Sequence, residues 1–279
     1  MTESAFPKPV AGAAIVAGGL IVALGLLRGV FPLDIKVAAL VLSLLVVSAL
    51  AAGFGRAWIN ILHDILQPVC VSAMLIGVTQ MLVRLDDPSL IGPAYAIAML
   101  APLYGLVLAG ITEPWRDPDA ELQIRTGFSV IALIALWVVM LSAIVTREGA
   151  MTFLSTSSLC LVMGGVLFFA GIDLLRGEYQ PGRWRNRLFG LGAIGLIGGS
   201  LVALGAIAEP KKVGGAMAFS LLTMLYALML LVSARIVFPN SVLKAGESSM
   251  GLGLTSLTVP VWVVSLLHLV VLVLTMMEP

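Results

Sequence analysis

The stretch LDDPSLIGPAYAIAMLAPLYG, residues 85–105, decides how the chain is divided. A charged turn leads directly into a long apolar run that contains prolines and a glycine. Pro88 is placed to begin a helix, because the first helical residue needs no backbone N–H donor. Pro93 follows closely. Pro102 lies deeper, where it removes a backbone hydrogen bond and is expected to bend the helix.

The composition is that of an integral membrane protein. Of 279 residues, 60% are hydrophobic and 11% are charged, and the mean hydropathy is +1.09. A soluble domain has about 45–50% apolar and about 25% charged residues. The net charge of +1 argues against a nucleic-acid partner. Cys70 and Cys160 lie in apolar runs and are interpreted as small hydrophobic residues rather than as a disulfide or a metal pair.

Nine apolar stretches are long enough to cross a hydrocarbon core of about 30 Å, which takes roughly 20 helical residues. They are 10–28, 35–54, 65–84, 91–112, 127–146, 154–172, 188–208, 214–237 and 256–277. The first is interpreted as a true span rather than a signal peptide, since no small-residue cleavage site follows it. Backbone groups in lipid must be satisfied within the segment. The predicted fold is therefore an all-α polytopic membrane protein whose short connections carry nearly every charge.

The distribution of basic residues favours a cytoplasmic N-terminus. With that orientation, ten of the 16 Lys and Arg residues fall on the cytoplasmic side. Nine spans then place the C-terminus outside. The expected location is the inner membrane of a bacterium, with the lipid bilayer as the first partner.

Residues 77–105 are similar to residues 199–227 of the same chain, at a constant offset of 122 residues and without a gap. The matched pairs are Gly77 with Gly199, Leu82 with Leu204, Pro88 with Pro210, Gly92 with Gly214, Ala94 with Ala216, Ala96 with Ala218, Leu100 with Leu222, Leu103 with Leu225 and Tyr104 with Tyr226. Asp87 meets Glu209. We interpret residues 1–122 and 123–244 as two copies of a four-helix unit, followed by one more helix in 245–279. Because four is even, the copies are expected to run parallel.

Residues 74–114 resemble the A subunits of flagellar stators, the MotA/PomA branch of the MotA/TolQ/ExbB superfamily. The matching residues are Gly77, Met81, Leu82, Asp86, Asp87, Pro88, Ile91, Gly92, Pro93, Ala94, Ala96, Ala98, Leu103, Tyr104 and Gly105. Residues 153–171 also look like the second span of that family. The resemblance implies subunits that surround single-span partners, in which proton or sodium flow past a partner carboxylate drives work.

Two departures from the family pattern stand out. Hydroxyl side chains are expected in the ion path of the family, but the matching positions here are Met74, Ala101 and Pro102. In the second copy these positions are Leu196, Thr223 and Met224, so one hydroxyl remains. The large cytoplasmic domain of the family is also missing, because the short segment GRAWINILHD stands in its place. Rotor-driving stator function is therefore not expected.

Other candidate chemistry is sparse. The segment GLGAIG, residues 190–195, fits a dinucleotide-binding pattern, but no strand precedes it, and it is better explained as a helix-contact face. His63–Asp64 is interpreted as an interfacial polar pair rather than as a proton site. Arg183, Arg185 and Arg187 are expected at the lipid headgroups. No enzyme activity, cofactor or metal is expected.

His268 lies within the last predicted span, where an ionisable group is a functional candidate by default, although a neutral histidine bonded to a neighbouring helix fits equally well. The last helix is interpreted either as one that closes the bundle or as a fused partner-like helix. The candidate motif and pore-region residues are Met74, Asp86, Asp87, Pro88, Gly92, Pro93, Pro102, Tyr104, Glu209, Pro210, Gly214, Thr223, Tyr226 and His268.

The leading hypothesis is an inner-membrane subunit of a MotA/TolQ/ExbB-like, ion-driven complex whose partner is a single-span subunit with an intramembrane aspartate. One alternative is a non-conducting scaffold of the same descent, and another is a small-solute transporter that uses the repeat interface. A homo-oligomer is left open. Polar residues around a central cavity would favour transport, whereas a dry interior lined by small residues would favour assembly.

Overall fold

The computed structural model describes residues 35–52, 58–83, 88–115, 126–148, 153–177, 181–205 and 210–238. The described elements are seven α-helices and one 3-10 turn. They are α2 (Ile35–Ala51), α3 (Trp58–Val83), α4 (Pro88–Thr112), η1 (Glu113–Trp115), α5 (Thr126–Glu148), α6 (Thr156–Arg176), α7 (Pro181–Gly205) and α8 (Pro210–Val237). The predicted spans 10–28 and 256–277, and with them His268, lie outside the described residues.

Four of these helices are long and apolar enough to cross a membrane: α3, α6, α7 and α8. This agrees with the all-α membrane class that the composition predicts. Two predicted boundaries are wrong in the same way, because α3 begins at Trp58 rather than at 65, and α7 begins at Pro181 rather than at 188. Hydropathy locates the part of a helix that suits hydrocarbon, whereas a helix can continue through polar residues toward water. The segments expected as connections thus supply the first turns of both helices.

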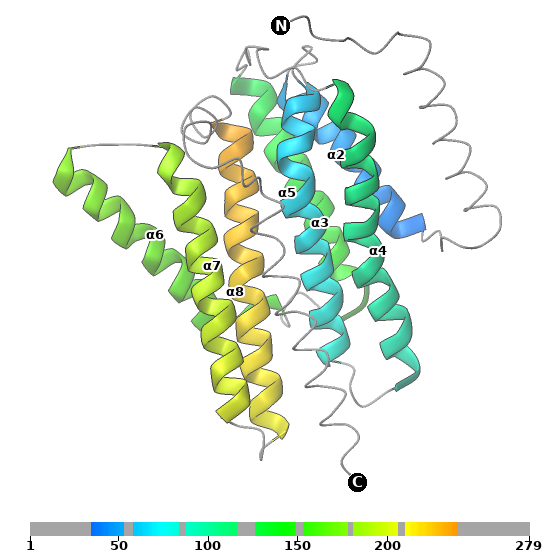
Figure 1. Cartoon of the computed structure of the whole chain (residues 1–279), viewed down its shortest axis with the longest axis vertical. Helices are drawn as coiled ribbons and strands as arrows, with labels where there is room; N and C mark the ends of the chain where they lie inside the picture. Colours follow the sequence, from blue (N-terminus) through cyan, green and yellow to red (C-terminus); the bar gives the residue numbers. More distant parts are fainter. Residues whose placement is uncertain are drawn as a thin grey trace, which may run out of the picture.

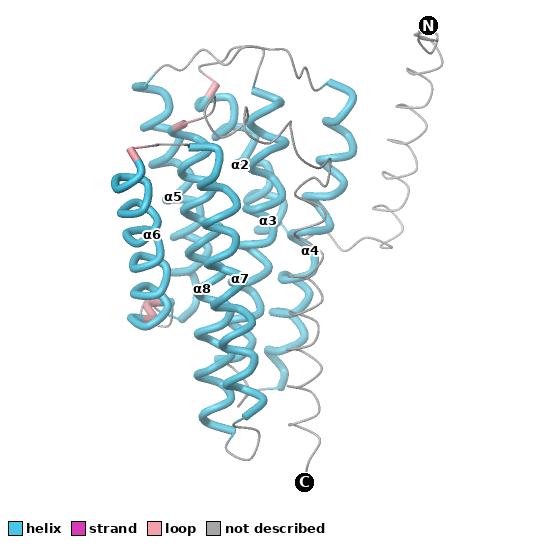
Figure 2. Tube along the Cα trace, turned by 60° about the vertical axis from the view of Figure 1, so that its left-hand side comes forward, coloured by secondary structure: helices cyan, strands magenta, loops and turns pink. Residues whose placement is uncertain are grey.

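The bundle is built around α3 and α8. Helix α3 packs against α2, α4, α5 and α8, while α8 packs against α3, α5, α6 and α7. Within the most apolar stretch of α3, 78% of the residues are buried, against 17% for α6. Helix α6 stands at the edge of the bundle in both views (Figures 1 and 2), and in Figure 1 it leans away from α7 toward the end where the two are connected. The hairpins α3–α4 and α7–α8 therefore form the centre.

Helix starts match the chemistry of their first residues. Pro88 begins α4 and Pro210 begins α8, where a missing N–H leaves no hydrogen bond unmade. Helix α6 begins behind an N-cap, because the Ser155 hydroxyl accepts the Ser158 backbone N–H at 3.3 Å. It ends at Gly177, whose φ of 65° is the left-handed conformation that favours glycine.

The two central hairpins pack in the same register. A Cβ on Gly77 of α3 would lie 2.8 Å from the Cβ of Ala98 in α4, and a Cβ on Gly199 of α7 would lie 2.6 Å from that of Ser220 in α8. Gly199 and Ser220 each follow their counterparts by 122 residues. Small residues at these points let the helix backbones approach closely.

A second pair of contacts keeps this register but exchanges the glycine. In the first hairpin the glycine is on α4, where a Cβ on Gly105 would lie 2.9 Å from the Cβ of Cys70. In the second hairpin it is on α7, where a Cβ on Gly192 would lie 2.9 Å from the Cβ of Ala227. Positions 192 and 227 again follow 70 and 105 by 122. Each crossing therefore needs one glycine, and either helix can supply it.

Adjacent glycines in α7 give a direct test of this close packing. A Cβ on Gly199 would lie 2.8 Å from the carbonyl oxygen of Ala216, whereas a Cβ on Gly198 meets nothing within 4 Å. Gly199→Ala should lower the free energy of unfolding by roughly 1–3 kcal/mol, the usual cost of overpacking. Gly198→Ala should leave it unchanged or raise it by up to about 1 kcal/mol, because alanine favours helix.

Unfolding of both variants in detergent micelles measures these effects, and Gly77→Ala should behave like Gly199→Ala. Equal effects at 198 and 199 would contradict the packing described.

Candidate functional site

Polar side chains from three parts of the chain meet at the start of α3. His63 and Asp64 lie in the second turn of α3, Glu113 follows the last residue of α4, and Arg235 lies in the last turn of α8. We call these four residues the α3 junction. It joins the first hairpin to the second, and by the distribution of basic residues it lies at the predicted cytoplasmic end.

Asp64 and Arg235 form an ion pair that links α3 to α8. The Arg235 guanidinium donates to Asp64 Oδ2 through Nη2 and, at 3.1 Å, through Nε. The side chains are well covered, with 17% of Asp64 and 6% of Arg235 exposed. Removing one partner would leave a charge with little access to water, so such pairs hold helices in one arrangement.

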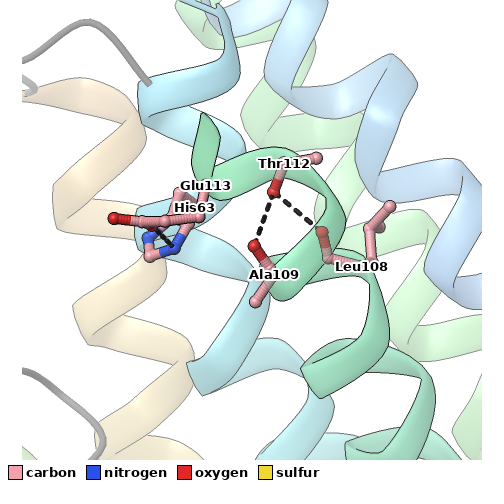
Figure 3. A network of polar contacts seen from close by, with 5 residues as sticks. All are labelled: His63, Leu108, Ala109, Thr112 and Glu113. Atoms are coloured by element: carbon pink, nitrogen blue, oxygen red, sulfur yellow. Dashed lines mark hydrogen bonds and ion pairs between the residues drawn. The ribbon is translucent and has the colours of Figure 1, made fainter. Parts of the chain in front are cut away.

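His63 pairs with Glu113 beside this contact, at 2.6 Å between Nε2 and Oε2 (Figure 3). Thr112 ends α4 just before it, where its hydroxyl donates to the carbonyls of Leu108 at 2.8 Å and Ala109 at 3.3 Å. The chain then turns into η1, which presents Glu113 toward α3. Because 57% of the Glu113 side chain is exposed, this pair is expected to contribute little to stability.

The interfacial pair expected at His63–Asp64 is therefore two separate contacts with two different helices. The partners were missed because Arg235 is 171 positions away from Asp64. The sequence held one indication that Glu113 and Arg235 lie at the same end of the bundle. The two residues occupy matching positions of the two copies, 122 residues apart.

The predicted pore positions lie inside the packed bundle. Met74 is 3% exposed and belongs to the main apolar core, as does Leu196 at 2%. Thr223 is fully buried, and its hydroxyl donates to the Phe219 carbonyl of its own helix at 2.7 Å while its methyl group faces Gly195. Thr223 carries the one hydroxyl that remains at the positions matched to the ion path of the family, and this hydroxyl forms a hydrogen bond within α8.

The remaining candidates are dispersed along α4 and α8. Pro102 is buried within α4, which continues through it as one helix, and Tyr104 is half-buried against the core. Gly92 and Pro93 lie in the first turns of α4, and Gly214 lies in the second turn of α8. Asp86, Asp87 and Glu209 lie outside the described residues. The expected bend at Pro102 stays a prediction.

Tyr226 has a structural role that the sequence did not reveal. Its hydroxyl donates to the backbone carbonyl of Phe153 and accepts the Ser155 N–H at 3.2 Å. Ser158 also donates to the Phe219 carbonyl at 3.2 Å. Helix α8 thereby fixes the start of α6 by three hydrogen bonds. Tyr226 also borders a small apolar pocket of about 50 Å³, together with Trp137, Met140 and Leu225.

A second buried ion pair joins α6 to α7. Arg187 donates to both carboxylate oxygens of Asp173, at 2.6 and 2.8 Å. Within the part of the chain that the structure describes, no group of three or more His, Cys, Asp or Glu side chains is placed to hold a metal ion. The charged contacts found here connect helices.

Breaking the Asp64–Arg235 pair should destabilise the bundle. Asp64→Asn is expected to lower the free energy of unfolding by roughly 3 kcal/mol, because it removes a carboxylate charge that the covered Arg235 guanidinium contacts. Glu113→Gln removes an exposed carboxylate from the same junction and should cost about 1 kcal/mol or less. Unfolding in detergent micelles compares the two.

The exchange of Asp64→Arg with Arg235→Asp in one chain should recover part of the loss. An Asp64→Asn effect no larger than that of Glu113→Gln would contradict a structural role for the pair.

No protein-family model matches the chain, and neither the curated proteins nor the solved structures contain a significant match to it. The resemblance to the MotA/TolQ/ExbB superfamily therefore rests on the residues of 74–114 and their copy.

Proposed function

We propose that this chain is a non-conducting membrane scaffold of MotA/TolQ/ExbB type, built from two parallel copies of a four-helix unit, in the inner membrane of a bacterium with its N-terminus in the cytoplasm. Its role is to hold other membrane subunits in a fixed arrangement. The observation that carries the proposal is the interior of the central hairpins, where positions expected to line an ion path are buried against neighbouring helices.

The contacts across the hairpins support this role. Gly77, Gly105, Gly192 and Gly199 each meet a neighbouring helix so closely that an added Cβ would clash. Ser220 donates to the Leu196 carbonyl of α7 at 2.6 Å, so a polar group at the crossing is also used to join helices. An interior of this kind suits a rigid framework better than a hydrated path, which needs polar groups open to water.

The matching register supports two copies of one unit. Contacts 77–98 and 70–105 recur as 199–220 and 192–227, and α3 and α7 end 122 residues apart, at Val83 and Gly205. Because Asp64 at the start of α3 contacts Arg235 at the end of α8, α3 starts at the end of the bundle where α7 also starts. The two hairpins thus point the same way, as expected for parallel copies.

A second candidate is a subunit of an ion-driven complex, with protons or sodium ions passing beside a single-span partner that carries an intramembrane aspartate. The exposed apolar surface of α6 favours this role, because Leu167 is 68% exposed and Phe168 64% exposed on a helix at the edge of the bundle. In this case the carboxylate comes from the partner. A small-solute transporter would need polar groups around a cavity, and the pocket beside Tyr226 is lined mainly by apolar side chains such as Trp137, Met140 and Leu225.

Ion flux separates the two candidates. Purified protein in liposomes under an imposed pH or sodium gradient should show no flux above that of empty liposomes. Thr223→Val should leave this result unchanged, since the Thr223 hydroxyl bonds within its own helix. An added ionophore verifies that the gradient can be discharged.

Flux through the chain alone would contradict the scaffold proposal. Flux that appears after co-reconstitution with a single-span partner, and disappears when the partner aspartate becomes asparagine, would favour the ion-driven subunit.

A further inference from the structure

The connected ends of α6 and α7 carry an arginine that is already neutralised. Arg187 holds both oxygens of Asp173, and its guanidinium carbon lies 5.2 Å from the ring centre of Phe169 and 5.6 Å from that of Trp184. A guanidinium held by a carboxylate and two aromatic rings is fixed in place. Arg187 therefore acts as a brace between the two helices.

Three more arginines lie at this end, and two of them are exposed. Arg176 ends α6 and Arg183 lies in the first turn of α7, and both side chains are exposed. Both lie within electrostatic reach of the Asp173 carboxylate, and neither forms an ion pair with an acid among the described residues. From 173 to 187 the sequence holds four arginines and two acids, a net charge of 4 − 2 = +2.

Bare apolar surface lies directly beside these charges. Arg183, Arg187, Gly190 and Ile194 are spaced by three or four residues and share one face of α7. A Cβ on Gly190 would meet nothing within 4 Å, and Ile194 is 61% exposed. Along this face of α7, the arginines are therefore followed by an exposed apolar surface.

The last turn of α6 carries further exposed apolar side chains. Leu174 is 83% exposed and Leu175 is 90% exposed, next to Arg176. Trp184 lies at the same level, and its indole N–H has no acceptor among the described residues. Basic residues, tryptophan and leucine gathered at one end of a helix pair are typical of a membrane interface.

We propose that this surface binds an anionic phospholipid, with the headgroup phosphate between Arg176 and Arg183 and an acyl chain along the apolar face of α6 and α7. Charge complementarity selects the anionic headgroup, and the adjoining apolar surface selects a lipid over a free phosphate. A lipid at this point would contact both α6 and α7, so binding should stabilise the attachment of α6.

The test is a thermal unfolding titration of the full chain in neutral detergent micelles. Added phosphatidylglycerol should raise the unfolding temperature in a saturable way, whereas phosphatidylcholine and inorganic phosphate should not. With about 1 kcal/mol for each basic residue near an anionic surface, the double variant Arg176→Gln, Arg183→Gln should need about thirtyfold more phosphatidylglycerol for the same half-maximal shift.

Arg185→Gln is the matched control, because it removes one positive charge at the same level but from another face of α7. Its half-maximal concentration should stay within about twofold of the unaltered protein, whatever its own stability. Arg176→Lys, Arg183→Lys keeps the charge and should lose less than the glutamine pair.

Three results would overturn the proposal. An equal shift with phosphatidylcholine would mean general lipid solvation. A shift with inorganic phosphate of the same size would mean an anion site without lipid selectivity. An Arg185→Gln effect clearly above twofold would mean diffuse attraction to the whole end of the bundle, because one charge in such a field is worth about 1 kcal/mol, or roughly fivefold.

Discussion

The close approach of helices at glycine is the constraint on which the rest of this bundle depends. Water does not drive helices together within lipid, so contact between backbones and the hydrogen bonds across them must do so. The α3–α4 and α7–α8 hairpins meet this requirement at matching points, with Gly77 against Ala98 and Gly199 against Ser220. These contacts fix the register of each hairpin. The register in turn places the charged ends of α3, α4 and α8 together.

The α3 junction then decides how the hairpins are combined. The covered Asp64–Arg235 pair joins the start of α3 to the end of α8, so both hairpins point in the same direction. The more exposed His63–Glu113 pair adds the end of α4 to the same place. Helix α2 covers the first hairpin, and α5 packs against α2, α3 and α8. Helix α6 is attached to the second hairpin through Tyr226 at its start and Asp173 near its end. This arrangement leaves α6 with a large apolar surface for lipid or for another subunit.

The sequence predicts the helical class and the apolar centre of each described helix, because hydropathy over about 20 residues reports the match to hydrocarbon directly. It places the starts of α3 and α7 seven residues too late. The first turns of these helices, such as the one that contains Trp184, hold polar residues that lower the local hydropathy. The sequence identifies the motif glycines but cannot say which helix each one contacts. The repeat indicates that Glu113 and Arg235 lie at the same end of the bundle, but not which acid or base each one contacts. The Asp64–Arg235 and Asp173–Arg187 pairs depend on which helices become neighbours. Thr223 was predicted near an ion path and is instead buried against Gly195, a placement decided by helix rotation.

The central claim is that the two hairpins lie side by side in the same direction, and short-range cross-linking tests it most directly. In a chain with Cys70→Ala and Cys160→Ser, one variant carries cysteines at 64 and 235, and another carries them at 64 and 213. Residue 235 lies at the end of α8 and residue 213 near its start. A short bifunctional thiol reagent applied to the membrane-embedded protein should join 64 to 235 and leave 64 and 213 unlinked. Linkage of 64 to 213 without linkage of 64 to 235 would show an inverted arrangement and contradict the account.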